Sequence, residues 1–135
     1  MAKVRFRIVL LYFLLKYVIL YILIMFLKSD YTFLRVDKLK SGEDWYYYVF
    51  MFMFLPIINI VLFSAVVYFS FRLKNFIAFI ALISLVSIAE YFVYAFFTSQ
   101  KHVDEYGVYN GIMGILLFIL LFHRQIMQVY RLSKR

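Results

Sequence analysis

The sequence of 135 residues contains no cysteine, one proline and four glycines. Without cysteine, the chain forms no disulfide and no thiolate-bound zinc or iron–sulfur site. So little proline and glycine leaves no room for a flexible linker or a low-complexity tail. Instead, 67% of the residues are hydrophobic, whereas soluble domains have about 45–50% apolar residues. A soluble core of this length cannot bury so many large side chains, so the composition predicts an integral membrane protein.

Four apolar segments are long enough to cross a bilayer as helices, which takes about 20 mostly apolar residues each. They run from about 6 to 27, 45 to 71, 76 to 97 and 106 to 122. Helices are favoured over barrel strands because the segments exceed about 10 residues and show no strict alternation. We therefore predict an all-α integral membrane protein in which residues 1–135 form one domain, a small bundle of four transmembrane helices.

The distribution of basic residues predicts the orientation of these spans. The N-terminus, the link between the second and third spans and the C-terminal tail together hold nine Lys or Arg and no acidic residue. The other two loops, 28–44 and 98–105, hold five basic and six acidic residues. Because excess Lys and Arg marks the cytoplasmic side, both termini are expected in the cytoplasm of a multi-pass protein. The residues expected at lipid headgroups are Arg5, Arg7, Arg72, Lys74, Arg124 and Arg131.

The tail over residues 123–135 is basic and amphipathic. Arg124, Gln128, Arg131 and Arg135 are spaced to share one face of a helix. The tail is therefore expected either to lie against anionic headgroups as an interfacial helix or to end as a solvated helix. Abundant Phe, Tyr, Ile and Lys favours an AT-rich bacterial gene and hence the inner (cytoplasmic) membrane. The aromatic residues lie in the spans, so no nucleic-acid partner is expected.

Two charged residues fall inside the predicted spans, Lys16 in the first and Glu90 in the third. A charge at such depth costs at least about 2.5 kcal/mol, so each needs a partner, a water-filled cavity or a route to the interface. Their axial offset is roughly 9 Å at helical rise, which long side chains can bridge. However, side chains lean toward the N-terminus of their helix, which tilts Lys16 away from Glu90. The sequence therefore leaves open a direct pair, a snorkelling Lys16, and a protonated or hydrogen-bonded Glu90.

Several other residues in the spans are expected to serve helix packing. Pro56 removes one helical hydrogen bond and predicts a kink near residues 52–56. Asn59 is expected to bond to another helix rather than to a ligand. Small residues recur on the third and fourth spans, and these stripes are expected either to pack on each other or to form a docking face for another subunit. The residues of the stripes are Ala78, Ala81, Ser84 and Ser87 on the third span and Gly107, Gly111 and Gly114 on the fourth.

No motif for catalysis, a metal or a cofactor stands out. His102, Asp104 and Glu105 are metal-ligand types at close spacing, but one histidine beside two acids is typical of a solvated loop. No Ser-His-Asp order, Gly-rich phosphate loop or paired carboxylate is present, so neither an enzyme nor a cofactor is expected.

Three classes of function remain. We expect a subunit or accessory (scaffold) component of a larger membrane complex, with other membrane-protein subunits as partners, because the loops are short and apolar packing surface is abundant. One alternative is a homo-oligomeric channel or pore-forming effector. The other is a small transporter or flippase coupled through Glu90.

Overall fold

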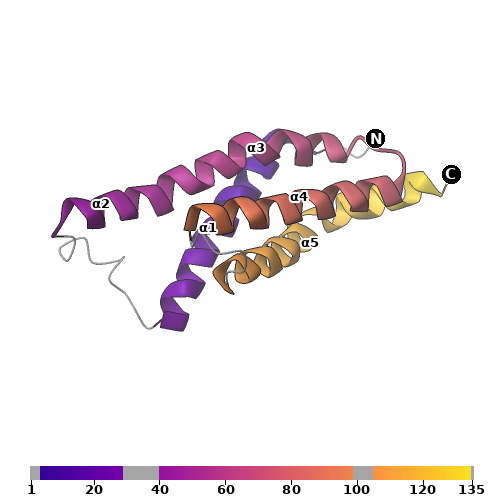
Figure 1. Cartoon of the computed structure of the whole chain (residues 1–135). Helices are drawn as coiled ribbons and strands as arrows, with labels where there is room; N and C mark the ends of the chain where they lie inside the picture. Colours follow the sequence, from indigo (N-terminus) through magenta and orange to yellow (C-terminus); the bar gives the residue numbers. More distant parts are fainter. Residues whose placement is uncertain (1–3, 29–39, 99–104, 135) are drawn as a thin grey trace.

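The computed structural model describes residues 4–28, 40–98 and 105–134, and within this part of the chain it is all-helical. Figure 1 shows the arrangement of the helices. They are α1 (Phe6–Lys28), α2 (Gly42–Val49), the π-helical turn η3 (Phe50–Phe54), α3 (Leu55–Ser70), α4 (Phe76–Thr98) and α5 (Glu105–Ser133).

The long helices form a closed ring. α4 packs against α5, α5 against α1, α1 against α3, and α3 against α4. Consequently α1 and α4 are diagonal partners that face each other across the bundle core. The two chain ends and the turn between α3 and α4 lie at the same end of the bundle (Figure 1). A hydrogen bond from the Phe76 backbone N–H to the Ser133 hydroxyl, at 3.1 Å, joins the start of α4 to the end of α5 there.

The outer surface is what a bilayer requires. Three helical stretches are long and apolar enough to span it: Phe6–Leu27, Phe76–Phe97 and Gly107–Ser133. Leu55–Ser70 is a fourth, shorter apolar helix. Ile77 is 78% exposed, and Val61 and Leu120 are each 71% exposed. Proteins in water rarely expose such a continuous apolar surface, so the chain is a small membrane-embedded protein.

The segment predicted as the second span is one continuous helical run with an irregular middle. α2, η3 and α3 follow one another without a break from Gly42 to Ser70. In the π-helical turn the Leu55 N–H donates to the Phe50 carbonyl, five residues back. Pro56 follows directly and has no N–H to offer an ordinary α-helical bond. The irregularity expected around Pro56 therefore takes the form of a widened turn that keeps the chain helical.

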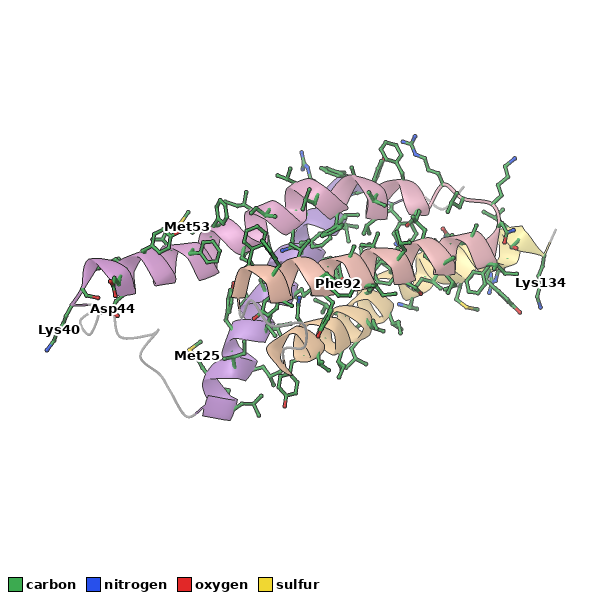
Figure 2. The ribbon with its side chains drawn as sticks, viewed as in Figure 1. Met25, Lys40, Asp44, Met53, Phe92 and Lys134 are labelled. Carbon is green, nitrogen blue, oxygen red and sulfur yellow. The ribbon has the colours of Figure 1, made fainter. Side chains whose placement is uncertain are left out.

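The start of α2 is fixed by a reciprocal capping box. The Ser41 hydroxyl accepts the Asp44 backbone N–H at 3.0 Å, and the Asp44 carboxylate accepts the Ser41 backbone N–H at 3.1 Å. Lys40 and Asp44 lie at the opposite end of the molecule from Lys134 (Figure 2). The acidic side chain of Asp44 therefore lies far along the bundle axis from the basic end of α5, in the company of one cation, Lys40.

Helix α5 continues well beyond the predicted end of the fourth span, to Ser133. Val129 is fully buried in the core, and the Tyr130 ring meets Phe76 edge-on with centroids 5.2 Å apart. Arg124 and Arg131 are exposed. The basic tail is therefore helical from 123 to 133, with one side packed on the bundle and a basic side facing outward.

Candidate functional site

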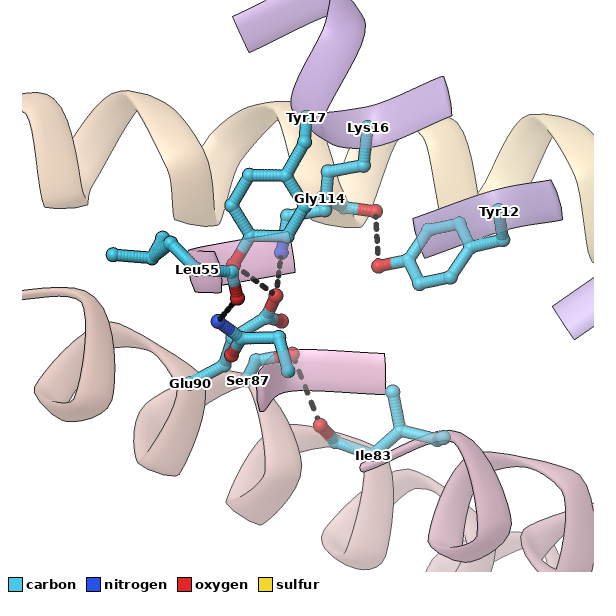
Figure 3. A network of polar contacts seen from close by, with 9 residues as sticks. Tyr12, Lys16, Tyr17, Leu55, Ile83, Ser87, Glu90 and Gly114 are labelled. Carbon is cyan, nitrogen blue, oxygen red and sulfur yellow. Dashed lines mark hydrogen bonds and ion pairs between the residues drawn. The ribbon is translucent and has the colours of Figure 1, made fainter. Parts of the chain in front are cut away.

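The most distinctive feature of the core is an ion pair between the diagonal helices. Lys16 of α1 and Glu90 of α4 meet with Lys16 Nζ 2.5 Å from Glu90 Oε1. Their side chains are 2% and 5% exposed, respectively. Figure 3 shows the pair and the polar groups around it. The structure therefore brings together the two intramembrane charges that the sequence singled out, and each is the other's partner.

The crossing of the helices explains why the sequence alone did not decide whether Lys16 and Glu90 form a direct pair. The estimate of a 9 Å offset assumes parallel helices, whereas Figure 1 shows α1 inclined relative to α4. The crossing brings the two side chains to one level of the bundle. Lys16 then lies between two apolar clusters, one containing Phe13 and Phe79 and the other containing Tyr17 and Leu55. A buried charge at this boundary is tolerable because the opposite charge is beside it.

Two tyrosines of α1 complete the polar centre. The Tyr17 hydroxyl donates to the same Glu90 Oε1 at 3.5 Å, and the Tyr12 hydroxyl donates to the Gly114 carbonyl of α5 at 3.1 Å. Tyr12 and Lys16 lie one turn apart on α1 and Tyr17 follows Lys16 directly, so two turns of this helix supply three polar contacts. The sequence analysis did not single out these tyrosines. The available signal was their position in the sequence: Tyr12 lies four residues before Lys16, and Tyr17 directly follows it.

Gly114 makes room for the ammonium group. A β-carbon placed at Gly114 would lie 2.9 Å from Lys16 Nζ, 3.0 Å from Lys16 Cε and 3.4 Å from the Tyr12 hydroxyl. Distances this short require the lysine end to move. Gly114 was expected to let helices approach each other, but the group it admits is the charged side chain itself.

Two buried amides lie in the same core. Asn59 of α3 is fully buried, and its Nδ2 donates to the Leu55 carbonyl one turn back at 2.9 Å. That bond is within its own helix, not the bond to a neighbouring helix that the sequence predicts. Asn110 of α5 is 1% exposed and lies within hydrogen-bonding reach of the Tyr17 hydroxyl. Asn110 is a site residue that sequence reasoning missed, although it shares a helix face with Gly114.

The small-residue stripes of α4 and α5 do not pack face to face. A β-carbon at Gly107 would lie 2.9 Å from the Tyr91 ring of α4, whereas nothing lies within 4 Å of one at Gly111. Ser84 is exposed, and the Ser87 hydroxyl donates to the Ile83 carbonyl of its own helix at 3.0 Å. Close approach of α4 and α5 therefore depends on Gly107 alone among these residues.

A groove of about 610 Å³ is lined mainly by α4 and α5, and Tyr12, Phe13 and Val67 of the neighbouring helices also contribute to it. Its rims include the exposed side chains of Ile80 and Ile119, and its floor includes the buried rings of Phe79 and Phe118. Glu90 also lines it. The groove therefore connects the lipid-facing surface with the buried ion pair.

The predicted headgroup residues occupy the end of the bundle that carries both termini. Their side chains are exposed, and one of them, Arg72, packs over aromatic rings, as does the nearby Lys134, which is not in the predicted set. The Arg72 guanidinium lies 4.8 Å from the Phe69 ring centroid and 5.3 Å from that of Tyr68, and Lys134 Nζ lies 4.6 Å from that of Tyr130. Such contacts hold a cation at interfacial depth. The exposed set is Arg5, Arg7, Arg72, Lys74, Arg124 and Arg131.

Metal-ligand side chains do not cluster within the described ranges, where no group of three His, Asp or Glu comes together. His102 and Asp104, two of the three residues weighed as loop ligands, lie outside the described residues, as does the side chain of Glu105.

The chain matches no protein-family model, and no curated protein or solved structure shows significant similarity to it.

Proposed function

We propose that the protein is an accessory subunit that scaffolds a larger membrane complex and performs no catalysis itself. The observation that carries this proposal is the inward pairing of Lys16 with Glu90. Intramembrane charges usually mark an ion path or a proton relay. Here they neutralise each other and tie diagonal helices together, which rigidifies the bundle. A rigid, apolar bundle can act by presenting its surface to neighbouring proteins.

A channel role has less support in the geometry. The centre of the bundle is filled by side chains, with Phe13 fully buried and Tyr17 1% exposed. A pore would therefore have to form between copies, from outer faces on which the described helices carry no charge at mid-bilayer depth. Selective pores are lined by backbone carbonyls or by rings of charged side chains.

The surface best suited to a partner is the projecting end of the helical run through α2. Figure 1 shows α2 extending past the ends of α4 and α5. Within the described chain, the substantial contacts of α2 are with η3, the turn that follows it. Trp45 is 46%, Tyr46 71% and Val49 47% exposed on this segment. Exposed aromatic side chains are typical of protein–protein interfaces, so we place the partner contact here.

The orientation belongs to the same proposal. We place the basic end, with both termini, in the cytoplasm of a bacterial inner membrane and α2 on the other side, giving four crossings. The distribution of charge supports this arrangement, because Arg72, Arg131 and Lys134 lie at one end without a described acidic residue, whereas at the other end Lys40 is accompanied by the acidic Asp44.

The test is the mass and composition of the assembly after extraction of the full chain in mild detergent. A hetero-oligomer is expected, and its partner should dissociate when Trp45→Ala and Tyr46→Ala are combined. The matched control is Val61→Ala, which truncates a side chain of α3 that is 71% exposed and lies away from α2. A monomer or a homo-oligomer in the native membrane would contradict the proposal. So would equal loss of the partner in both variants.

A second candidate is a small transporter coupled through Glu90, because this carboxylate lines the groove between α4 and α5. A bound cation would compete with Lys16 for the carboxylate, which would couple binding to protonation. The prediction is substrate or proton flux in vesicles containing the purified chain, abolished by Glu90→Gln. Equal flux in the chain and the variant would exclude this candidate.

A further inference from the structure

The groove between α4 and α5 runs from the polar centre to the basic end of the bundle. On α5 its lining begins at Gly114 and ends at Met127, and on α4 it extends from Glu90 back to Phe79. Since α4 and α5 are antiparallel, Glu90 lies level with Gly114, and Ile80 lies toward Met127. The groove is thus an elongated depression that runs along the two helices and faces the lipid of the bilayer.

The length of the groove matches one leaflet. Met127 lies thirteen helical steps beyond Gly114, which is about 20 Å at helical rise. The hydrocarbon core of a bilayer is about 30 Å thick, so one leaflet supplies about 15 Å of acyl chain. A groove that starts near mid-depth and ends at the headgroup region therefore has the length of one lipid tail.

The chemistry of the inner end fits an uncharged tail. Glu90 is already neutralised by Lys16, so this end requires no charged ligand. The floor beyond it is aromatic and aliphatic, with Phe79, Val86 and Phe118 buried. Ser84 and Ser87 of α4, together with Gly114, keep the groove open because their side chains are small or absent.

The open end is positively charged. Arg131 lies one turn beyond Met127 on the same face of α5, and Lys134 lies close by, with its ammonium over the Tyr130 ring. The exposed Lys74 precedes α4 at this end. No acidic residue occurs between 71 and 80 or between 120 and 135. The first N–H groups of α4 are satisfied by Asn75 and Ser133, so the basic side chains are the groups available to an anion.

From this match of shape, length and charge we infer that the groove binds one acyl chain of an anionic phospholipid, with the lipid phosphate held by Arg131 and Lys134. This site is independent of the partner contact placed on α2. A lipid held here would cover the apolar floor between α4 and α5 and extend the bundle surface.

The test uses the full chain in phosphatidylcholine vesicles that contain a small share of phosphatidylglycerol with a photoreactive group in its acyl chain. Adducts are mapped by mass spectrometry after illumination. Enrichment on Ile80 and Ile119 is expected over Leu14 and Val18, which are comparably exposed on α1. Unlabelled phosphatidylglycerol should compete far better than unlabelled phosphatidylcholine.

Two variants separate the headgroup contact from general attraction. Combining Arg131→Gln with Lys134→Gln should lower the groove adducts by about fivefold for each charge removed. The matched control combines Arg5→Gln with Arg7→Gln, which removes two charges at the same end of the bundle but beside α1 rather than at the α5 end of the groove. Ser84→Phe places a large side chain in the groove and should abolish the adducts. The Arg131/Lys134 and Arg5/Arg7 variants change only exposed side chains and should remain folded.

Several results would overturn the inference. These are equal labelling of the groove and of the α1 face, equal competition by the two lipids, and equal loss in the Arg5/Arg7 control. Adducts between groove residues and another protein in the native membrane would assign the groove to a helix of a partner or of a second copy instead.

Discussion

The ammonium of Lys16 lies 2.9 Å from the point that a β-carbon would take at Gly114, so the glycine and the ion pair depend on each other. Gly114→Ala should therefore displace Lys16 from Glu90 and destabilise the bundle by about 1–3 kcal/mol, the usual cost of overpacking a core. Thermal unfolding of the purified chain in detergent measures this effect.

Gly111→Ala is the matched control, because nothing lies within 4 Å of a β-carbon at that position. Both substitutions replace glycine by alanine within α5, three residues apart. The gain in helix propensity is therefore the same in both and cancels when their unfolding free energies are compared. Gly111→Ala should leave stability unchanged or raise it by up to about 1 kcal/mol, the helix-propensity gain of alanine over glycine. Equal effects of the two variants would show that Gly114 does not serve the ion pair.

The capping box at α2 predicts a pH-dependent helix end. Hydrogen bonds from Ser41 hold the pKa of the Asp44 carboxyl below its usual value. A lowered pKa stabilises the folded helix end above the unfolded value of about 3.9, and this stability is lost as the pH falls through the lower folded value. Fluorescence of Trp45, the sole tryptophan, reports on this turn.

Trp45 emission should therefore be constant above about pH 4 and should change below it, since protonated Asp44 no longer caps the helix. In Ser41→Ala the acid transition should shift to higher pH, because the donated bonds to the carboxylate are weakened. Glu43→Gln is the control, since Glu43 is exposed and lies outside the capping box. A transition that is unchanged in Ser41→Ala would count against the cap.

The four-crossing topology is testable with single cysteines, because the natural chain has none. Lys74→Cys and Lys134→Cys should react with a membrane-impermeant maleimide only from the cytoplasmic side. Lys40→Cys, at the opposite end of the bundle, should react only from the other side. Labelling of all three from one side would mean that the run from α2 to α3 does not cross the membrane.

The lengths of the apolar runs allowed two helices to be predicted closely from the sequence. The predicted segments 6–27 and 76–97 correspond to α1 and α4, each of which is one residue longer. Such ends are visible in a sequence because charged or polar residues bound the apolar run. Helix α2 begins before the predicted second span because Ser41 and Asp44 cap a helix within a polar stretch. Helix α5 continues through the tail that was expected to be helical, and Val129 packs this basic part on the bundle.

The candidate site was predictable in its two charges but not in its pairing. Lys16 and Glu90 stand out because charges are rare in apolar runs. Whether they meet depends on the crossing of α1 and α4, which follows from packing around the whole ring. Similarly, the contacts of Gly114 and Asn110 are determined only by the packing of α5 against α1. The sequence shows these residues as small or polar, and the tertiary contacts decide what they touch.

The most direct test of the ion pair is a double-mutant cycle on Lys16→Met and Glu90→Gln, with unfolding free energies measured for the full chain in detergent or bicelles. Each single variant leaves one buried polar group without its partner and should cost about 3–5 kcal/mol. The double variant removes both charges and should recover at least about 1.5 kcal/mol relative to the sum of the single effects. Additivity within about 0.5 kcal/mol would contradict an ion pair between Lys16 and Glu90 in the bundle core.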